Sequence, residues 1–147
     1  MHEYYEDVEV GVTDEFGHYE VTEAEIIEFA EQYDPQPFHV DPEAAERSWF
    51  GGLIASGWHT SAMTMRMIVD NYINESGAMG AIGVENLEWR NPVRPGMSLH
   101  VESEVLDKEP WQPGIGTVQS RTETVADGET TVMSMEAKVL FPMREEG

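Results

Sequence analysis

One long apolar segment, residues 58–74, places the strongest constraint on how this chain folds. Its apolar side chains recur at helical spacing, and a helix with this much apolar surface needs another layer to cover it. Beyond residue 80 the hydrophobic period changes to two, the period of strands, and turn-forming segments divide the region at 91–96, 108–114 and 126–129. In the last segment the apolar side chains on one face are Met133, Met135, Ala137, Val139 and Phe141. We therefore predict an α+β domain in which about four antiparallel strands wrap one central helix.

The N-terminal third predicts short helices joined by a stiff loop. A capping box, Thr22 with Glu25, precedes apolar residues at helical spacing over 22–33. Two prolines stop this helix near Asp34, because they lack amide donors and push the preceding residues towards extended conformations. The segment that follows is predicted to be an ordered loop, with a further helical stretch over 42–48 that begins at an Asp cap.

Charge limits the classes of partner. The chain has 147 residues, and 29 acidic side chains against 8 Lys and Arg give a net charge of −21. Nucleic acid and anionic membranes repel such a surface, and no Lys or Arg run offers a local phosphate-binding stripe. No apolar run approaches the ~20 residues of a membrane span. We expect one domain, residues 1–147, with neither nucleic acid nor a membrane as partner.

Composition also bears on the compartment. The chain has no cysteine, which excludes disulfides, thiolate nucleophiles and thiolate metal sites. Its first residues form neither a basic nor an apolar leader, so we expect a cytoplasmic protein. Concentrated salt would relieve the repulsion among its carboxylates, since the Debye length is only about 3 Å at 1 M. A halophilic cytoplasm is therefore our hypothesis, with an acidic surface in an ordinary cell as the alternative.

The chemistry-bearing residues lie in two neighbouring segments, 33–42 and 50–57. Asp34 and His39 are separated by two prolines, so a stiff loop can point both side chains into one pocket as an acid/base pair. Gly57 lies at the expected start of the long helix, where free amides and the helix dipole stabilise a developing oxyanion. The plain alternative is that Asp34 only ends a helix and that His39 is a buried structural histidine.

At these residues the chain resembles the MaoC-like dehydratase family, whose (R)-specific enoyl-CoA hydratases have a hot-dog fold. The family signature is close to D-x-N-P-hydrophobic-H-x-D-P, and the matching residues here are Asp34, Gln36, Pro37, Phe38, His39, Asp41 and Pro42. The resemblance continues through residues 50–57 and the segment 89–99, and it covers about residues 4–141. The most specific part of the resemblance lies in residues 34–57.

The resemblance implies a reaction and the residues that perform it. Asp34 and His39 would share the addition and removal of water across the C2=C3 bond of an acyl thioester, converting trans-2-enoyl-CoA into (3R)-3-hydroxyacyl-CoA. Gly57 would supply the amide that binds the thioester oxygen as it gains enolate character. No redox cofactor or metal is implied, and coenzyme A enters as part of the substrate. Relatives usually form homodimers, and an unpaired sheet edge also favours a homodimer or a dimer of dimers.

Several residues depart from the family pattern. Gln36 replaces the usual Asn, Ser56 replaces a His that often precedes the oxyanion Gly, and Tyr33 replaces a Gly. A serine found on the central helix of some hydratases has no match in the corresponding segment, 64–66. The candidates for substrate binding are Gln36, Phe38, Ser56, Arg90 and Arg94, the two arginines as partners of coenzyme A phosphates or of surface carboxylates.

Alternatives remain for the metal, the apolar lining and the activity. His39, Asp41 and His59 can be drawn as a metal site, but their spacing matches no closed zinc pattern, so we predict no metal and local packing for His59. Met63, Met65 and Met67 are expected in the core and along an acyl tunnel. The competing functions are a hot-dog thioesterase, in which a carboxylate activates water against the carbonyl, and a non-catalytic acyl-thioester-binding domain.

Overall fold

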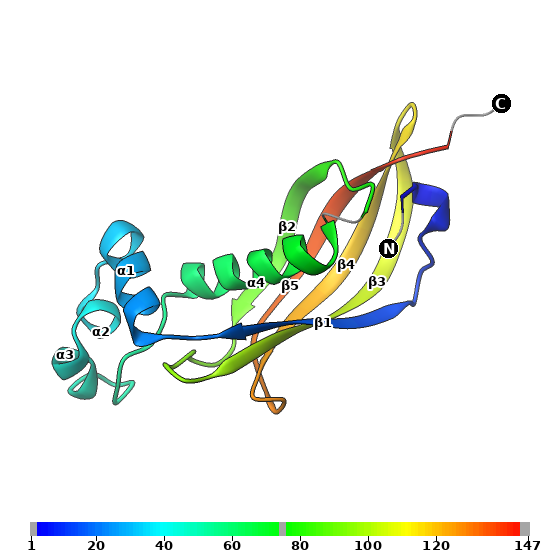
Figure 1. Ribbon diagram of the computed structural model, residues 1–147. Coiled ribbons are helices and arrows are strands. Elements are labelled where there is room, and N and C mark those ends of the chain that lie inside the picture. Colours follow the sequence, from blue (N-terminus) through cyan, green and yellow to red (C-terminus); the bar gives the residue numbers. More distant parts are fainter. Residues whose placement is uncertain (1–2, 74–75, 145–147) are drawn as a thin grey trace.

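A computed structural model describes residues 3–73 and 76–144, and its main feature is a five-stranded antiparallel sheet beside one long helix (Figure 1). The strand order is β1-β3-β4-β5-β2. The elements in chain order are a 3-10 helix Tyr5–Asp7, β1 Thr13–Glu20, α1 Glu23–Tyr33, α2 Pro37–Val40, α3 Pro42–Glu46, α4 Gly57–Asn71, β2 Gly80–Trp89, β3 Ser98–Gln112, β4 Ile115–Ala126 and β5 Thr130–Pro142. The predicted α+β class and the four strands after the long helix are confirmed.

The first strand, β1, was not predicted from the sequence. It pairs with β3 as an edge strand, and its register shifts between Phe16 and Tyr19. That shift interrupts the alternation by which a strand is recognised. Gly17 lies in the shifted stretch with φ of +88°, and a Cβ there would meet the side chain of Met67 on α4 at 2.9 Å. Glycine therefore permits both the left-handed backbone and the close approach of the helix.

Helix α4 packs on the sheet along one face. Its buried side chains include Met63 and Met67, and the hydroxyl oxygens of Thr64 and Thr124 lie 2.6 Å apart between helix and sheet. The expectation that another layer covers the apolar surface of this helix holds for this face only, because Trp58 and Met65 on the other face are 58% and 45% exposed. The described helix ends at Asn71, and its predicted end at residue 74 lies outside the described residues.

The three short helices gather at the end of the sheet where α4 begins (Figure 1). Helix α1 starts as predicted, with the Thr22 hydroxyl accepting a hydrogen bond from the amide of Glu25. The segment after Asp34 was predicted to be a loop, but Pro37 starts the single helical turn α2, because proline at the first helical position needs no amide partner. The Asp41 side chain then caps α3 as predicted.

No helix within residues 3–73 or 76–144 is long and apolar enough to cross a membrane.

Candidate active site

His39 is held in place by a backbone carbonyl. The side chain is buried, and its Nδ1 lies 2.7 Å from the carbonyl oxygen of Ile54 in the segment that leads into α4. A carbonyl only accepts hydrogen bonds, so Nδ1 carries a proton and Nε2 is the nitrogen free for chemistry. Nε2 lies 3.4 Å from Oδ2 of Asp34. The predicted acid/base pair is therefore brought together.

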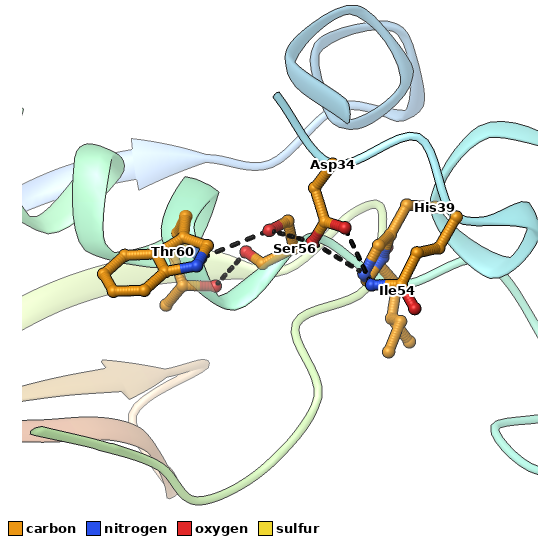
Figure 2. A network of polar contacts seen from close by, with 7 residues as sticks. Asp34, His39, Ile54, Ser56 and Thr60 are labelled. Atoms are coloured by element: carbon orange, nitrogen blue, oxygen red, sulfur yellow. Dashed lines mark hydrogen bonds and ion pairs between the residues drawn. The ribbon is translucent and has the colours of Figure 1, made fainter. Parts of the chain in front are cut away.

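Asp34 receives hydrogen bonds on both carboxylate oxygens. The Gln36 amide donates to Oδ1 over 2.7 Å. The Ser56 hydroxyl donates to Oδ2, also over 2.7 Å (Figure 2). Partial burial by itself raises the pKa of Asp34, but the hydrogen bonds from Ser56 and Gln36 and the nearby His39 together outweigh it and lower that pKa. Asp34 is consequently an ionised, well-ordered carboxylate at neutral pH.

Ser56 connects this carboxylate to the start of α4. Besides donating to Asp34, its hydroxyl oxygen accepts a hydrogen bond from the amide of Trp58, which caps the helix. Ser56 is 0% exposed, so it lies behind Asp34 and away from the surface that a substrate would touch. Its position in the sequence suggested substrate binding, whereas the geometry gives it contact with the carboxylate.

Gly57 begins α4 beside the pair. Among the described residues, its amide has no hydrogen-bond partner, so it remains available at the positive end of the helix dipole. A side chain here would overlap the indole of Trp89, which packs directly against the glycine. Trp89 is in turn fixed by a 3.1 Å hydrogen bond from its Nε1 to the Ser61 hydroxyl and by an edge-to-face contact with Trp58. Because Gly57 has no side chain, its amide stays accessible and the indole of Trp89 can pack against its backbone.

These groups open into one cleft of about 670 Å³. Asp34, His39 and Gly57 line it together with Gln36 and Phe38. Five aromatic side chains form a further part of the wall, namely Tyr33, Trp49, Phe50, Trp58 and Trp89. The aromatic wall went unnoticed in the sequence, although Trp58 directly follows the glycine of the motif. The cleft can hold an apolar acyl group against a small set of polar groups.

The two candidate arginines differ in their surroundings. Arg90 lines the cleft, but it forms an ion pair with Glu88 at 2.9 Å and donates to the Ser134 hydroxyl. Arg94 donates to the carbonyl oxygen of Phe50 at 2.7 Å and does not line the cleft. Arg90 thus has the surface carboxylate that was one of its two expected partners, whereas Arg94 contacts a backbone carbonyl.

A second hollow lies at the other half of α4. It is an apolar cavity of about 130 Å³ between the helix and the inner face of the sheet, and Met65, Ile68 and Tyr72 contribute to its lining. The predicted core methionines are therefore divided, because Met63 and Met67 are buried whereas the exposed Met65 borders this cavity.

The candidate metal ligands do not form the site drawn from the sequence. Asp41 is engaged as the cap of α3, and His59 stacks on Phe29 with ring centroids 4.7 Å apart. Over the described ranges, a group with suitable ligand spacing is formed by Glu15, His100 and Glu102, whose ligand atoms lie within 4.8 Å of one another on β1 and β3. That group is on the outer face of the sheet, away from the cleft.

Comparison with known proteins identifies the class that this fold and cleft define. The family model described as a MaoC like domain matches residues 9–127, and the chain belongs to this MaoC-like dehydratase family. The fold is accordingly the hot-dog fold that the resemblance implied. The sequence is 31% identical to a 3-hydroxybutyryl-CoA dehydratase from Methylorubrum extorquens over 145 residues, covering 97% of this chain and 87% of that protein.

Two solved structures support the same assignment. A MaoC-like dehydratase from Rhodospirillum rubrum is 41% identical, with a TM-score of 0.87 over 97% of this chain and 99% of that chain. The R-hydratase PhaJ1 from Pseudomonas aeruginosa is 26% identical, with a TM-score of 0.76 over 97% of this chain and 88% of that one.

Proposed function

We propose that this protein is a hydratase/dehydratase that adds water reversibly to trans-2-enoyl-CoA to give (3R)-3-hydroxyacyl-CoA. The observation that carries the proposal is the pairing of Asp34 with the Nε2 of His39 at 3.4 Å. The same cleft holds the amide of Gly57, which has no hydrogen-bond partner in the part of the chain that the structure describes. A hydratase in the family and a relative named as a 3-hydroxybutyryl-CoA dehydratase support the same reaction class.

The chemistry requires charge to move onto the thioester oxygen. In hydration, water oxygen bonds to C3 while electrons shift through C2 to the carbonyl, and C2 then receives a proton. The Gly57 amide stabilises the enolate-like oxygen because it points from a helix N-terminus and need not reorganise. Asp34 and His39 lie where one can take the proton of water and the other can supply the proton to C2. Dehydration follows the same steps in reverse.

Binding uses further groups that line the cleft and Arg94 beside them. Phe38 offers an apolar surface to the acyl group, while Gln36 orients Asp34 through a hydrogen bond and borders the cleft. Arg90 and Arg94 are proposed to interact with the phosphates of coenzyme A. Hydration transfers no electrons to an acceptor, so the proposed reaction needs no redox cofactor. The Gly57 amide supplies the stabilisation of the thioester oxygen, and we propose that no metal takes part.

The function is tested with crotonyl-CoA in molar KCl, following the enoyl-thioester absorbance while a thiol reagent runs in parallel on the same sample. We expect the absorbance to fall without thiol release, because hydration leaves the thioester intact. Release of free thiol would instead support a thioesterase. No change in either channel, with this and longer enoyl-CoA substrates, would contradict the proposed activity and leave a binding domain.

We also propose that the protein acts as a homodimer or a dimer of dimers. Strand β2 is a sheet edge, and Ile82, Val84 and Trp89 on it are 46%, 51% and 43% exposed. A second copy that pairs with this edge would cover these side chains and the free backbone groups of the strand. We expect a dimer in sedimentation at molar KCl and a shift to monomer for Val84→Lys, and a wild-type monomer would refute the dimer.

The compartment that we propose is a cytoplasm rich in salt. On the outer face of the sheet, Glu102 lies directly opposite both Glu15 on β1 and Glu123 on β4, so like charges face each other across three strands. Such pairs destabilise a sheet unless cations screen them. The melting temperature should therefore rise by several degrees between dilute buffer and molar KCl, and an unchanged value would argue against this proposal.

A further inference from the structure

His100 on β3 lies between two carboxylates on the outer face of the sheet. Its Nε2 is 3.0 Å from Oε2 of Glu102 on the same strand and 3.4 Å from Oε1 of Glu15 on β1. The chain neighbours of His100, Leu99 and Val101, are 1% and 0% exposed and belong to the core. Because side chains alternate along a strand, the imidazole points away from that core. Three groups with metal-ligand chemistry therefore converge on the face of the sheet opposite the core.

The pairing of β1 with β3 fixes this arrangement. Glu15 and Glu102 are directly opposite each other in the register, which holds their Cβ atoms about 4.5–5.5 Å apart. The side chain of His100 is only 21% exposed, so neighbouring groups restrict its rotation. Glu15 and Glu102 also border a surface hollow of about 430 Å³, in which water molecules can complete a coordination shell. The two strands thus supply three preformed ligands with one open side.

Arg121 on β4 compensates other carboxylates of this face. Its Nη2 lies 2.9 Å from Oε1 of Glu104, and its Nε lies 3.7 Å from Oε1 of Glu123. Among the described residues, neither Glu15 nor Glu102 has a Lys or Arg within ion-pair distance. A proton on the histidine Nε2 can be donated fully to one of these two carboxylates at a time, whereas a metal ion would bind all three groups together.

We propose that Glu15, His100 and Glu102 form a binding site for a divalent first-row transition-metal ion, with Zn²⁺ as the probe. Imidazole nitrogen and carboxylate oxygen are common ligands of these ions, with bonds of about 2.0–2.2 Å. Two ligand atoms of one such ion lie about 3.0 Å apart in an octahedron and about 3.4 Å apart in a tetrahedron. The separations at His100, 3.0 and 3.4 Å, match these values. Mg²⁺ and Ca²⁺ fit less well, because they prefer oxygen ligands.

The ion would stabilise the edge strand β1 and would take no part in the reaction. The register of β1 with β3 shifts between Phe16 and Tyr19, directly after Glu15. A metal ion that joins Glu15 to β3 replaces repulsion between two carboxylates by coordination bonds at the residue before this shift. Strand β1 continues into α1, which ends at Asp34 of the proposed acid/base pair. The site therefore holds the strand that precedes the catalytic segment.

The site is tested by titrating the protein with Zn²⁺ in molar KCl after a chelator has been dialysed away. Molar salt screens the diffuse attraction of cations to the acidic surface, whereas coordination bonds persist. We expect calorimetry to show one Zn²⁺ bound and the melting temperature to rise by several degrees. An excess of Mg²⁺ should not reproduce this rise. No binding of Zn²⁺ by the wild type would overturn the proposal.

Two histidine variants show whether the ion binds at this site. His100→Gln removes the nitrogen ligand, so the affinity for Zn²⁺ should fall about tenfold or more. The matched control is His18→Gln, because His18 on β1 is 70% exposed and lies 3.6 Å from a single carboxylate, that of Glu20. The control should bind Zn²⁺ like the wild type, and Glu15→Gln should lose affinity as His100→Gln does. Wild-type affinity in His100→Gln, or equal losses in both histidine variants, would overturn the proposal.

Turnover separates this site from the hydratase function. His100 does not line the cleft, so a chelator should leave kcat/KM for crotonyl-CoA unchanged at a temperature where the protein stays folded. Binding of Zn²⁺ through His100 by a protein that hydrates no enoyl-CoA would uphold the metal site and refute the hydratase. Hydration by a protein that binds no Zn²⁺ would do the reverse.

Discussion

Two buried histidines lie close to the start of α4, and their surroundings differ. His39 and His59 are 4% and 5% exposed. His39 has its Nδ1 on a backbone carbonyl and its Nε2 facing the carboxylate of Asp34. His59 stacks on Phe29, and its Nδ1 finds no hydrogen-bond partner among the described residues. Burial alone therefore does not mark a catalytic histidine, whereas one anchored nitrogen and one nitrogen aimed at a second titratable group do.

The largest effect is expected from breaking the pair itself. His39→Ala and Asp34→Asn should each lower kcat by about 10²–10⁴-fold, because each removes one of the two groups that move protons. Steady-state kinetics with crotonyl-CoA measures this, and circular dichroism checks that the fold is kept. Near-normal turnover in either folded variant would refute the acid/base assignment.

A smaller effect should follow from loosening the support of Asp34. Ser56→Ala removes a hydrogen bond to the ionised carboxylate, and that bond helps to lower the pKa of Asp34. The pKa should rise, so the acid limb of the kcat/KM profile should move to higher pH, and kcat/KM should fall about tenfold.

The control for Ser56 is Ser61→Ala, which deletes a hydroxyl on α4 that contacts Trp89 and the Gly57 carbonyl but not Asp34. It should leave the acid limb where it is. If the two serine variants shifted the profile equally, Ser56 would have no special role in holding the carboxylate.

The smallest effect on catalysis is expected at the second histidine. His59→Phe keeps a flat ring on Phe29 and should leave kcat/KM within about threefold of the wild type. A loss as large as that of His39→Ala would erase the distinction between the two histidines.

The stability of the protein at acid pH should depend on His59. Burial lowers the pKa of His59 below its ordinary 6.5. As pH falls below 6.5, the unfolded chain binds a proton that the folded protein resists, so stability decreases until the folded pKa is reached. His59→Phe should remove this part of the acid destabilisation while changing little above pH 7. Melting temperatures of the wild type and of His59→Phe between pH 5 and 8 test this. Parallel plots of melting temperature against pH would contradict it.

The site was predictable where its residues are neighbours in the chain. Asp34 and His39 lie in one stiff segment, and two prolines limit where their side chains can point. The start of α4 at Gly57 follows from a small-residue turn before a long apolar run. The helix caps Thr22 and Asp41 were also predictable, because their hydrogen bonds reach only two or three residues along the chain.

Contacts between distant segments were not predictable in this way. The bond from Ser56 to Asp34 spans 22 residues, and that from His39 to Ile54 spans 15. The same holds for the indole of Trp89 against Gly57, which only the packing of β2 beside α4 creates. Strand β1 escaped prediction because its register shift at the edge breaks the alternation. Hydrophobic periodicity indicates which face of a helix or strand is buried, whereas these contacts depend on how the helices and strands pack together.

The most direct test of the central claim is hydration of crotonyl-CoA in D₂O, followed by NMR of the product. If Asp34, His39 and the Gly57 amide act as proposed, the wild type should form (3R)-3-hydroxybutyryl-CoA with one deuterium at C2 and an intact thioester. Asp34→Asn and His39→Ala should each fail to form it at a comparable rate. Formation of free acid and thiol, or deuterated product from both variants at the wild-type rate, would contradict the assignment of this cleft as a hydratase site.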